Sequence, residues 1–131
     1  RSCASCGRVR VLIIEDAPDV AWRVLDALEE TAQFELLGAV PDGDGALARI
    51  RAERPELVVL DLGLPGRPGL DVLRDLRDLA PDCRVVVHSG QDEFAVRAAA
   101  LATGAVAFVG KGDGVDALID ALLRAAHTGA A

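Results

Sequence analysis

The sequence has little positive charge, few cysteines and no long apolar run. Its 131 residues contain 14 Lys and Arg against 21 Asp and Glu, which gives a formal net charge of −7. This balance disfavours direct binding to nucleic acid, because phosphate contacts need a basic surface. No apolar stretch approaches the roughly 18 residues of a membrane span, and no secretory signal is visible. These absences predict a cytoplasmic protein without membrane contact, and the length suits one domain.

The three cysteines offer little metal or redox chemistry. Cys3 and Cys6 form a CxxC in an irregular N-terminal stretch, whereas a redox CxxC usually follows a strand and opens a helix. A zinc site needs two further nitrogen or sulfur ligands, for which the chain offers only Cys83 and a distant histidine. We therefore expect residues 1–7 to be a disordered tail and Cys83 to be a small core residue.

Lysine is scarcer still, since Lys111 is the only lysine among the 14 basic residues. A single lysine in a chain that otherwise uses arginine either arises by chance or marks a position that needs a slender, flexible ammonium group instead of a planar guanidinium. The second interpretation makes Lys111 a candidate functional residue.

Apolar runs alternate with helical patterns five times along the chain. The predicted strands cover 9–14, 34–40, 57–60, 84–88 and 105–109, and the helices that follow them cover 18–28, 46–51, 70–79, 92–103 and 115–123. Continuous apolar strands separated by helices imply a parallel sheet that is covered on both faces. Five units are too few for an eightfold barrel, so the pattern predicts an open, doubly wound α/β sheet. This domain would span 8–127, with 128–131 as a tail or the start of a linker.

Charged and hydroxyl side chains follow the predicted strands, where ligands bind in such sheets. They are Glu15 and Asp16 after the first strand, Asp61 after the third, Ser89 after the fourth and Lys111 after the fifth. Carboxylates a few ångströms apart repel by about 4 kcal/mol per pair at an effective dielectric constant of about 20. One ammonium cannot offset three carboxylates, and an oxygen-only cluster suits a hard ion such as Mg²⁺. A Pro- and Gly-rich loop after Asp61 constrains the backbone, so that a carbonyl there can face the ion.

An aspartate nucleophile, a metal, a lysine and a hydroxyl form a phosphoryl-transfer constellation. Positioning and charge neutralisation supply most of such catalysis, and carboxylates are known to form aspartyl phosphates. The strand ends carry no paired Cys and His and no GxGxxG.

The order of these motifs resembles the receiver domain of bacterial two-component response regulators. The resemblance covers roughly residues 8 to 127 and rests on Glu15-Asp16, Asp61-Leu-Gly-Leu-Pro65-x-x-x-Gly69, Ser89-Gly90 and Phe108-Val-Gly-Lys111. It implies a flavodoxin-like fold with strand order 2-1-3-4-5. The sequence departs from the common pattern at Gly112, where many receivers have proline, and at Glu15 and Ser89, where Asp and Thr are commoner.

The resemblance also implies the roles of the site residues. Asp61 would accept a phosphoryl group from a histidine kinase or phosphotransfer protein. Glu15, Asp16, Asp61 and the Gly63 carbonyl would hold Mg²⁺. Ser89, Gly90 and Lys111 would bind the phosphoryl group, and Phe108 would turn inward as an aromatic switch. The chain would be a signalling switch and not a turnover enzyme.

The resemblance implies partner surfaces as well. The fourth helix, fifth strand and fifth helix would form an output surface for a second copy or an effector domain. The helical segment 94–102 is apolar nearly all round, so it is buried or faces a partner. Trp22 lies off the apolar stripe of the first helix and would be exposed, where it could contact a kinase.

Other interpretations stay open from the residues alone. Asp16 and Ser89 could be helix caps, Phe108 a core residue, and His88 a core or edge histidine. A haloacid-dehalogenase-type hydrolase would carry an acid where Gly63 stands, and a flavin or nucleotide carrier would not place Glu15 in its phosphate loop. A receiver-like docking module that is not phosphorylated is the main alternative.

Overall fold

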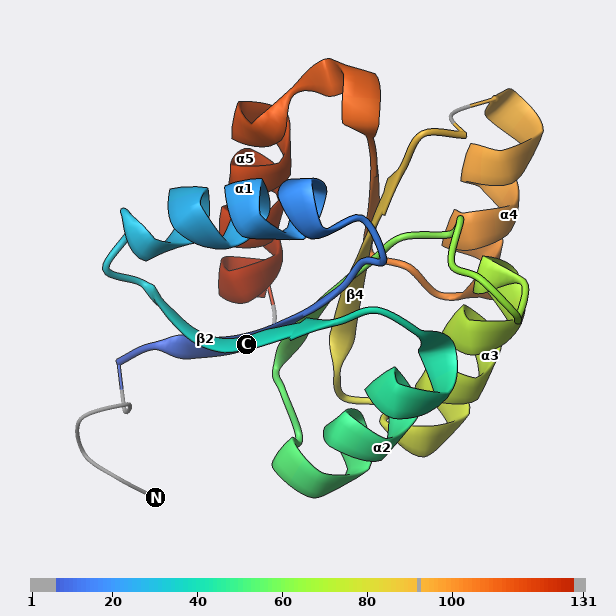
Figure 1. Ribbon diagram of the computed structural model, residues 1–131, viewed down its shortest axis with the longest axis horizontal. Helices are drawn as coiled ribbons and strands as arrows, with labels where there is room; N and C mark the ends of the chain where they lie inside the picture. The colour runs from blue at the N-terminus through green and yellow to red at the C-terminus, as the bar shows by residue number, and fades with distance from the viewer. Residues whose placement is uncertain (1–6, 92, 129–131) are drawn as a thin grey trace.

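Five parallel strands form a sheet in the computed structural model, which describes residues 7–91 and 93–128 (Figure 1). The strands are β1 (Val9–Ile14), β2 (Phe34–Val40), β3 (Leu57–Leu60), β4 (Arg84–Ser89) and β5 (Ala107–Gly110). They lie in the order β2-β1-β3-β4-β5, which confirms the predicted order. The central strand is therefore β3, and the residue that follows it emerges at the middle of the sheet edge.

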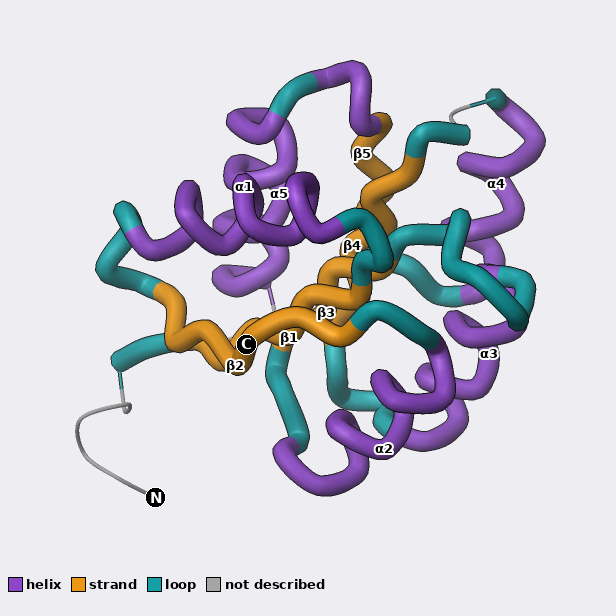
Figure 2. Tube along the Cα trace, in the orientation of Figure 1, coloured by secondary structure: helices purple, strands orange, loops and turns teal. Residues whose placement is uncertain are grey.

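Helices cover both faces of this sheet, as the predicted doubly wound fold requires (Figure 2). They are α1 (Pro18–Glu29), α2 (Gly43–Glu53), α3 (Gly69–Leu79), α4 (Phe94–Thr103) and α5 (Val115–Thr128), with a short 3-10 helix, η2 (Lys111–Asp113), before α5. Side chains of α1 and α5 pack on one face, and those of α2, α3 and α4 pack on the other. Within the described ranges no helix combines the length and the apolar character needed to cross a bilayer.

Strand β3 shows why an apolar run with no polar alternation becomes the centre of the sheet. All four of its residues are buried. Leu57 and Val59 pack under α1 and α5, whereas Val58 and Leu60 pack under α2 to α4. Because both faces of β3 are covered, every side chain gains from leaving water.

Several boundaries differ from the sequence prediction by one to three residues. Strand β4 continues to Ser89, β5 begins at Ala107, and α2 covers Gly43–Glu53 instead of 46–51. Helix α2 begins earlier because the Asp42 carboxylate accepts a hydrogen bond from the Gly45 amide at 2.6 Å and caps it. Helix α4 begins at Phe94.

The predicted tails at 1–7 and 128–131 fall mostly outside the described residues, as do Cys3 and Cys6. Cys83 is buried just before β4, which confirms its prediction as a core residue. Burial raises the pKa of its thiol to about 11, so the side chain stays an uncharged thiol at neutral pH.

Candidate functional site

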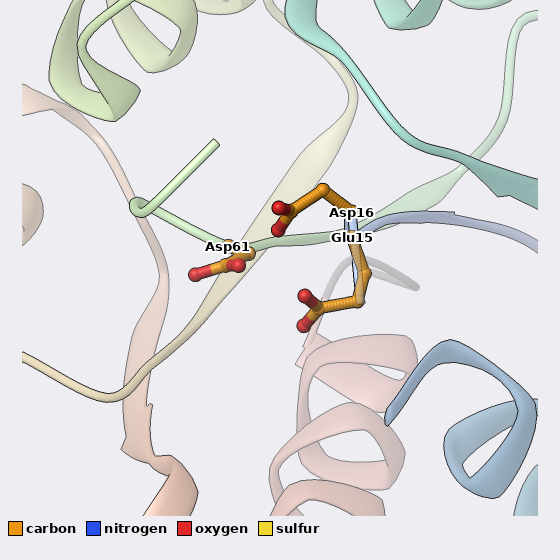
Figure 3. A group of neighbouring side chains, drawn as sticks. All are labelled: Glu15, Asp16 and Asp61. Atoms are coloured by element: carbon orange, nitrogen blue, oxygen red, sulfur yellow. The ribbon is translucent and has the colours of Figure 1, made fainter. Parts of the chain in front are cut away.

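Three carboxylates meet at the carboxyl edge of the sheet, as their places after β1 and β3 predict (Figure 3). One oxygen from each of Glu15, Asp16 and Asp61 lies within 4.8 Å of the others. Glu15 and Asp61 are each 5% exposed, whereas Asp16 is exposed. Two buried acids and one accessible acid therefore share a small volume that opens to solvent on the Asp16 side.

The backbone holds the two buried acids in fixed positions. The amide of Glu15 donates to the Val40 carbonyl and that of Asp61 donates to the Ile14 carbonyl, both at 3.0 Å. These hydrogen bonds extend the parallel ladder by one residue beyond each strand. The side chains are also restrained, because Asp61 Oδ1 accepts from the Gly63 amide at 3.0 Å and Glu15 Oε2 accepts from the Ala17 amide at 3.1 Å.

Lys111 bridges the two buried acids from the end of β5. Its Nζ lies 2.9 Å from Glu15 Oε1 and 3.3 Å from Asp61 Oδ2. Burial lowers the pKa of Lys111, but its hydrogen bond to Glu15 and the charge of Asp61 outweigh that effect and raise it. Burial raises the pKa of Glu15, although the hydrogen bond from Lys111 opposes this. The lone lysine of the chain therefore lies between two buried carboxylates.

The donor set of this cluster fits a hard divalent cation. All three side chains offer carboxylate oxygens, which are the ligands of Mg²⁺ and Ca²⁺, and none offers the nitrogen or sulfur typical of zinc. Lys111 supplies one positive charge against three negative ones, so the cluster retains an excess of negative charge. Glu15, Asp16 and Asp61 could thus hold a metal ion.

Ser89 and Gly90 lie beside this cluster at the end of β4. Ser89 is 1% exposed, and its Oγ accepts a hydrogen bond from the Gln91 amide at 3.0 Å. Gly90 is exposed. The interpretation of Ser89 as a helix cap is wrong, because α4 begins after Glu93, without a side-chain cap. Ser89 shapes the loop after β4 and keeps a hydroxyl proton that it can donate.

The interpretation of Asp16 as a helix cap is wrong as well. The residue before α1 is Ala17, and no side chain caps the N-terminus of that helix. Pro18 instead opens the helix at a position where its missing amide hydrogen has no partner to lose. This leaves the Asp16 carboxylate free of a capping role and grouped with the other two acids.

Phe108 is a buried core residue in this structure, with a contact that the sequence did not reveal. It is 8% exposed and packs with the side chains under α2 to α4. The guanidinium of Arg97 lies 4.6 Å from its ring centroid, and Arg97 Nη1 donates to the Phe108 carbonyl at 3.3 Å. A cation stacked on an aromatic face stabilises both side chains. Arg97 is the only charged residue in the sequence of α4, which was the one available signal.

Of the remaining candidates from the sequence, His88 is buried, whereas Trp22 and most of α4 are at the surface. His88 is 5% exposed, and burial, together with the charge of Lys111, lowers its pKa, so it is a neutral core histidine as expected. Trp22 is 69% exposed on α1, as its position off the apolar stripe predicts. Of the residues of α4, only Ala100 is buried, and Phe94 is 85% exposed. Helix α4 therefore leaves apolar surface open to solvent.

Comparison with known proteins identifies the family to which the chain belongs. A family model described as the response regulator receiver domain matches residues 11–123. The virulence transcription regulator BvgA of Bordetella pertussis is 36% identical over 112 residues, which cover 86% of this chain and 53% of BvgA. The chain thus spans about half the length of this relative. Other similar curated proteins include regulators, such as NtrX of Azorhizobium caulinodans and PhoP of Pseudomonas aeruginosa, and also proteins named as protein-glutamate methylesterases.

Solved structures of receiver domains have the same fold as this chain. The receiver domain of the response regulator NarL from Mycobacterium tuberculosis superimposes with a TM-score of 0.85 and 32% identity, over 92% of this chain and 97% of that one. A Burkholderia pseudomallei response regulator, solved with a phosphorylated aspartic acid, a calcium ion and citrate, gives a TM-score of 0.79 and 28% identity, over 92% and 70%. The family model covers most of the chain, and the fold and the acidic cluster agree with it. The chain belongs to the receiver-domain family of two-component response regulators.

Proposed function

We propose that Asp61 accepts a phosphoryl group from a histidine kinase or a phosphotransfer protein. The observation that carries this proposal is the buried Asp61 carboxylate at the centre of the sheet edge, 3.3 Å from Lys111 Nζ and grouped with two further acids. Asp61 is restrained by the Gly63 amide, so the nucleophile is positioned before any donor arrives. The Burkholderia relative with a phosphorylated aspartic acid supports this chemistry in a similar fold.

Glu15, Asp16 and Asp61 would hold Mg²⁺, with the Gly63 carbonyl as a further ligand. The oxygen-only donor set and its excess negative charge support this choice. When bound, Mg²⁺ neutralises negative charge on the phosphoryl oxygens and on the acceptor. The exposed side of the cluster, at Asp16, is the side from which the ion and the donor can reach Asp61.

Each residue of the site has its own role in the phosphoryl transfer. A carboxylate oxygen of Asp61 forms a bond to phosphorus while the phosphorus–nitrogen bond of the phosphohistidine breaks, and its electron pair stays on the imidazole nitrogen. The Lys111 ammonium, already beside Asp61, binds a phosphoryl oxygen. The hydroxyl of Ser89 donates to another, and the exposed Gly90 lies next to it on the phosphoryl-binding side. Phe108 is already buried in this structure, so its role as an aromatic switch would be a change of packing within the core as Ser89 is drawn to the phosphoryl group.

The product is a switch that acts through other proteins. Phosphorylation adds up to two negative charges at Asp61, which biases the surface formed by α4, β5 and α5 between two states. That surface would bind a second copy or an effector domain. The chain would act in the cytoplasm. It would not turn over a substrate as an enzyme does, and it would not itself bind nucleic acid. Since the match covers only 53% of BvgA, a transcriptional output would belong to residues outside this chain.

The test is intact-mass spectrometry after incubation with acetyl phosphate and Mg²⁺. We expect the mass of one phosphoryl group to be added to the wild-type protein. The addition should be lost in Asp61→Asn and in the presence of EDTA. A folded wild-type protein that gains no phosphoryl group from acetyl phosphate or from phosphorylated kinases would overturn the proposal and favour the docking-module alternative.

A further inference from the structure

The loop that carries Lys111 has little of its own to hold it in place. It reads Gly110-Lys111-Gly112-Asp113-Gly114, so glycine flanks each charged residue. A side chain at Gly112 would meet nothing within 4 Å, and Gly114 adopts a φ of +91°, where glycine is favoured. Gly110 is held by its pairing with Ser89 in the sheet, but neither packing at Gly112 nor stiff residues fix the backbone that follows Lys111.

The Asp113 side chain supplies the missing restraint. Its Oδ2 accepts a hydrogen bond from the Gly110 amide at 3.1 Å and closes η2 onto the last residue of β5. Lys111 lies inside the ring that this bond closes. The backbone contact across the same turn, from the Gly114 amide to the Lys111 carbonyl, is longer, at 3.5 Å.

The position of this backbone matters because the Lys111 ammonium must reach two carboxylates. Lys111 Nζ contacts Glu15 and Asp61 at the same time. A lysine side chain has four flexible bonds, so a loose backbone would let the ammonium sample solvent instead of this position. The capped turn holds Cα of Lys111 at a fixed place at the end of β5.

We infer that Asp113 is a positioning residue for Lys111: its carboxylate anchors the glycine-rich turn, and through that turn it places the ammonium against Asp61. The role in phosphoryl transfer rests on the proposed function. Asp113 itself touches neither the acceptor nor any of the three acids by a described contact, so it acts through Lys111.

Three variants separate this role from the effect of removing a negative charge. Asp113→Ala removes the acceptor and the charge, whereas Asp113→Asn removes the charge and keeps an acceptor oxygen. Asp116→Ala removes a similar charge from the first turn of α5, outside the loop. We expect Asp113→Ala to slow phosphorylation by acetyl phosphate about fivefold, the size of effect of losing one capping hydrogen bond. Asp113→Asn should stay within about twofold of the wild type, and so should Asp116→Ala.

A second readout needs no phosphorylation. Lys111 is the only lysine, so isotopically labelled lysine gives NMR signals from this residue alone. We expect the order parameter of its terminal methylene to fall in Asp113→Ala and to recover in Asp113→Asn. If Asp113→Ala only destabilised the whole protein, the free energy of unfolding would fall, but the order parameter of Lys111 in the folded protein would not change.

The two proposals fail in different ways. A wild-type protein that takes up no phosphoryl group contradicts the proposed function, while the lysine order parameter still tests Asp113. Unchanged lysine order in a folded Asp113→Ala protein overturns the positioning role, whatever the phosphorylation rate. Equal loss of lysine order in Asp113→Asn and Asp113→Ala would also overturn it, because the effect would then follow charge and not the hydrogen bond.

Discussion

Removing the exposed acid of the cluster should stabilise the metal-free protein. Asp16 lies with Glu15 and Asp61 in a group whose oxygens are all within 4.8 Å of one another. Lys111 contacts the other two acids. The variant Asp16→Asn keeps the shape of the side chain and removes its charge, so it relieves two repulsions and breaks neither ion pair of the lysine.

The size of the gain follows from Coulomb's law. At 4.8 Å, two unit charges repel by about 0.9 kcal/mol in water and by about 3.5 kcal/mol at an effective dielectric constant of about 20. Because Asp16 is exposed, the lower figure applies to each pair. Salt screening reduces it further, since the Debye length at physiological ionic strength is about 8 Å. We therefore expect the free energy of unfolding to rise by about 1 to 2 kcal/mol.

The assay is urea denaturation in EDTA and again in Mg²⁺. At tenfold its Kd, Mg²⁺ should stabilise the wild-type protein by about 1.4 kcal/mol, and it should stabilise Asp16→Asn less because a ligand has been lost. The control is Asp26→Asn, which removes an exposed charge from α1 outside the cluster and should change neither curve. Loss of stability of Asp16→Asn in EDTA, or equal stabilisation of both proteins by Mg²⁺, would refute the reasoning.

Three further predictions concern the fold and its charges. Gly69→Ala should lower the free energy of unfolding by about 1 to 3 kcal/mol in urea, because a Cβ there would lie 2.4 Å from the Leu62 Cα; unchanged stability would contradict the tight contact. Burial raises the pKa of Glu15 above its ordinary value of 4.5, so the folded protein binds this proton more tightly and the contribution of Glu15 to metal-free stability falls as the pH rises above 4.5. Glu15→Gln should flatten that fall, and an equally steep fall in this variant would count against it. Arg97→Met should cost about 1 to 2 kcal/mol through its lost contacts with Phe108, and a double-mutant cycle with Phe108→Leu that shows no coupling would argue otherwise.

The fold and the acidic cluster were predictable for a geometric reason. Apolar runs such as Leu57–Leu60 have one stable environment, a strand covered on both faces. Parallel strands bring their carboxyl ends to the same edge, so Asp61 and Glu15 had to meet once the strands were placed. The strand order itself needed the resemblance, because hydrophobic periodicity does not specify which strands are neighbours.

What the sequence left hidden depends on loops and on packing between distant elements. The stacking of Arg97 on Phe108 joins α4 to β5 and depends on how α4 sits on the sheet. The hydrogen bond from the Gly110 amide to Asp113 depends on a turn whose glycines permit many conformations. The capping interpretations of Asp16 and Ser89 were wrong for a related reason, since a cap is decided by the residue at which the helix begins. Propensity places that residue only to within a few positions.

The central claim is that Asp61, and no other acid of the cluster, carries the phosphoryl group. Reduction with borohydride converts an aspartyl phosphate to homoserine, and peptide mass spectrometry then identifies the position. After incubation with acetyl phosphate and Mg²⁺, the account predicts homoserine at residue 61 alone, and none in EDTA. Conversion at Asp16, reduction of Glu15, or no conversion in a folded protein would contradict it.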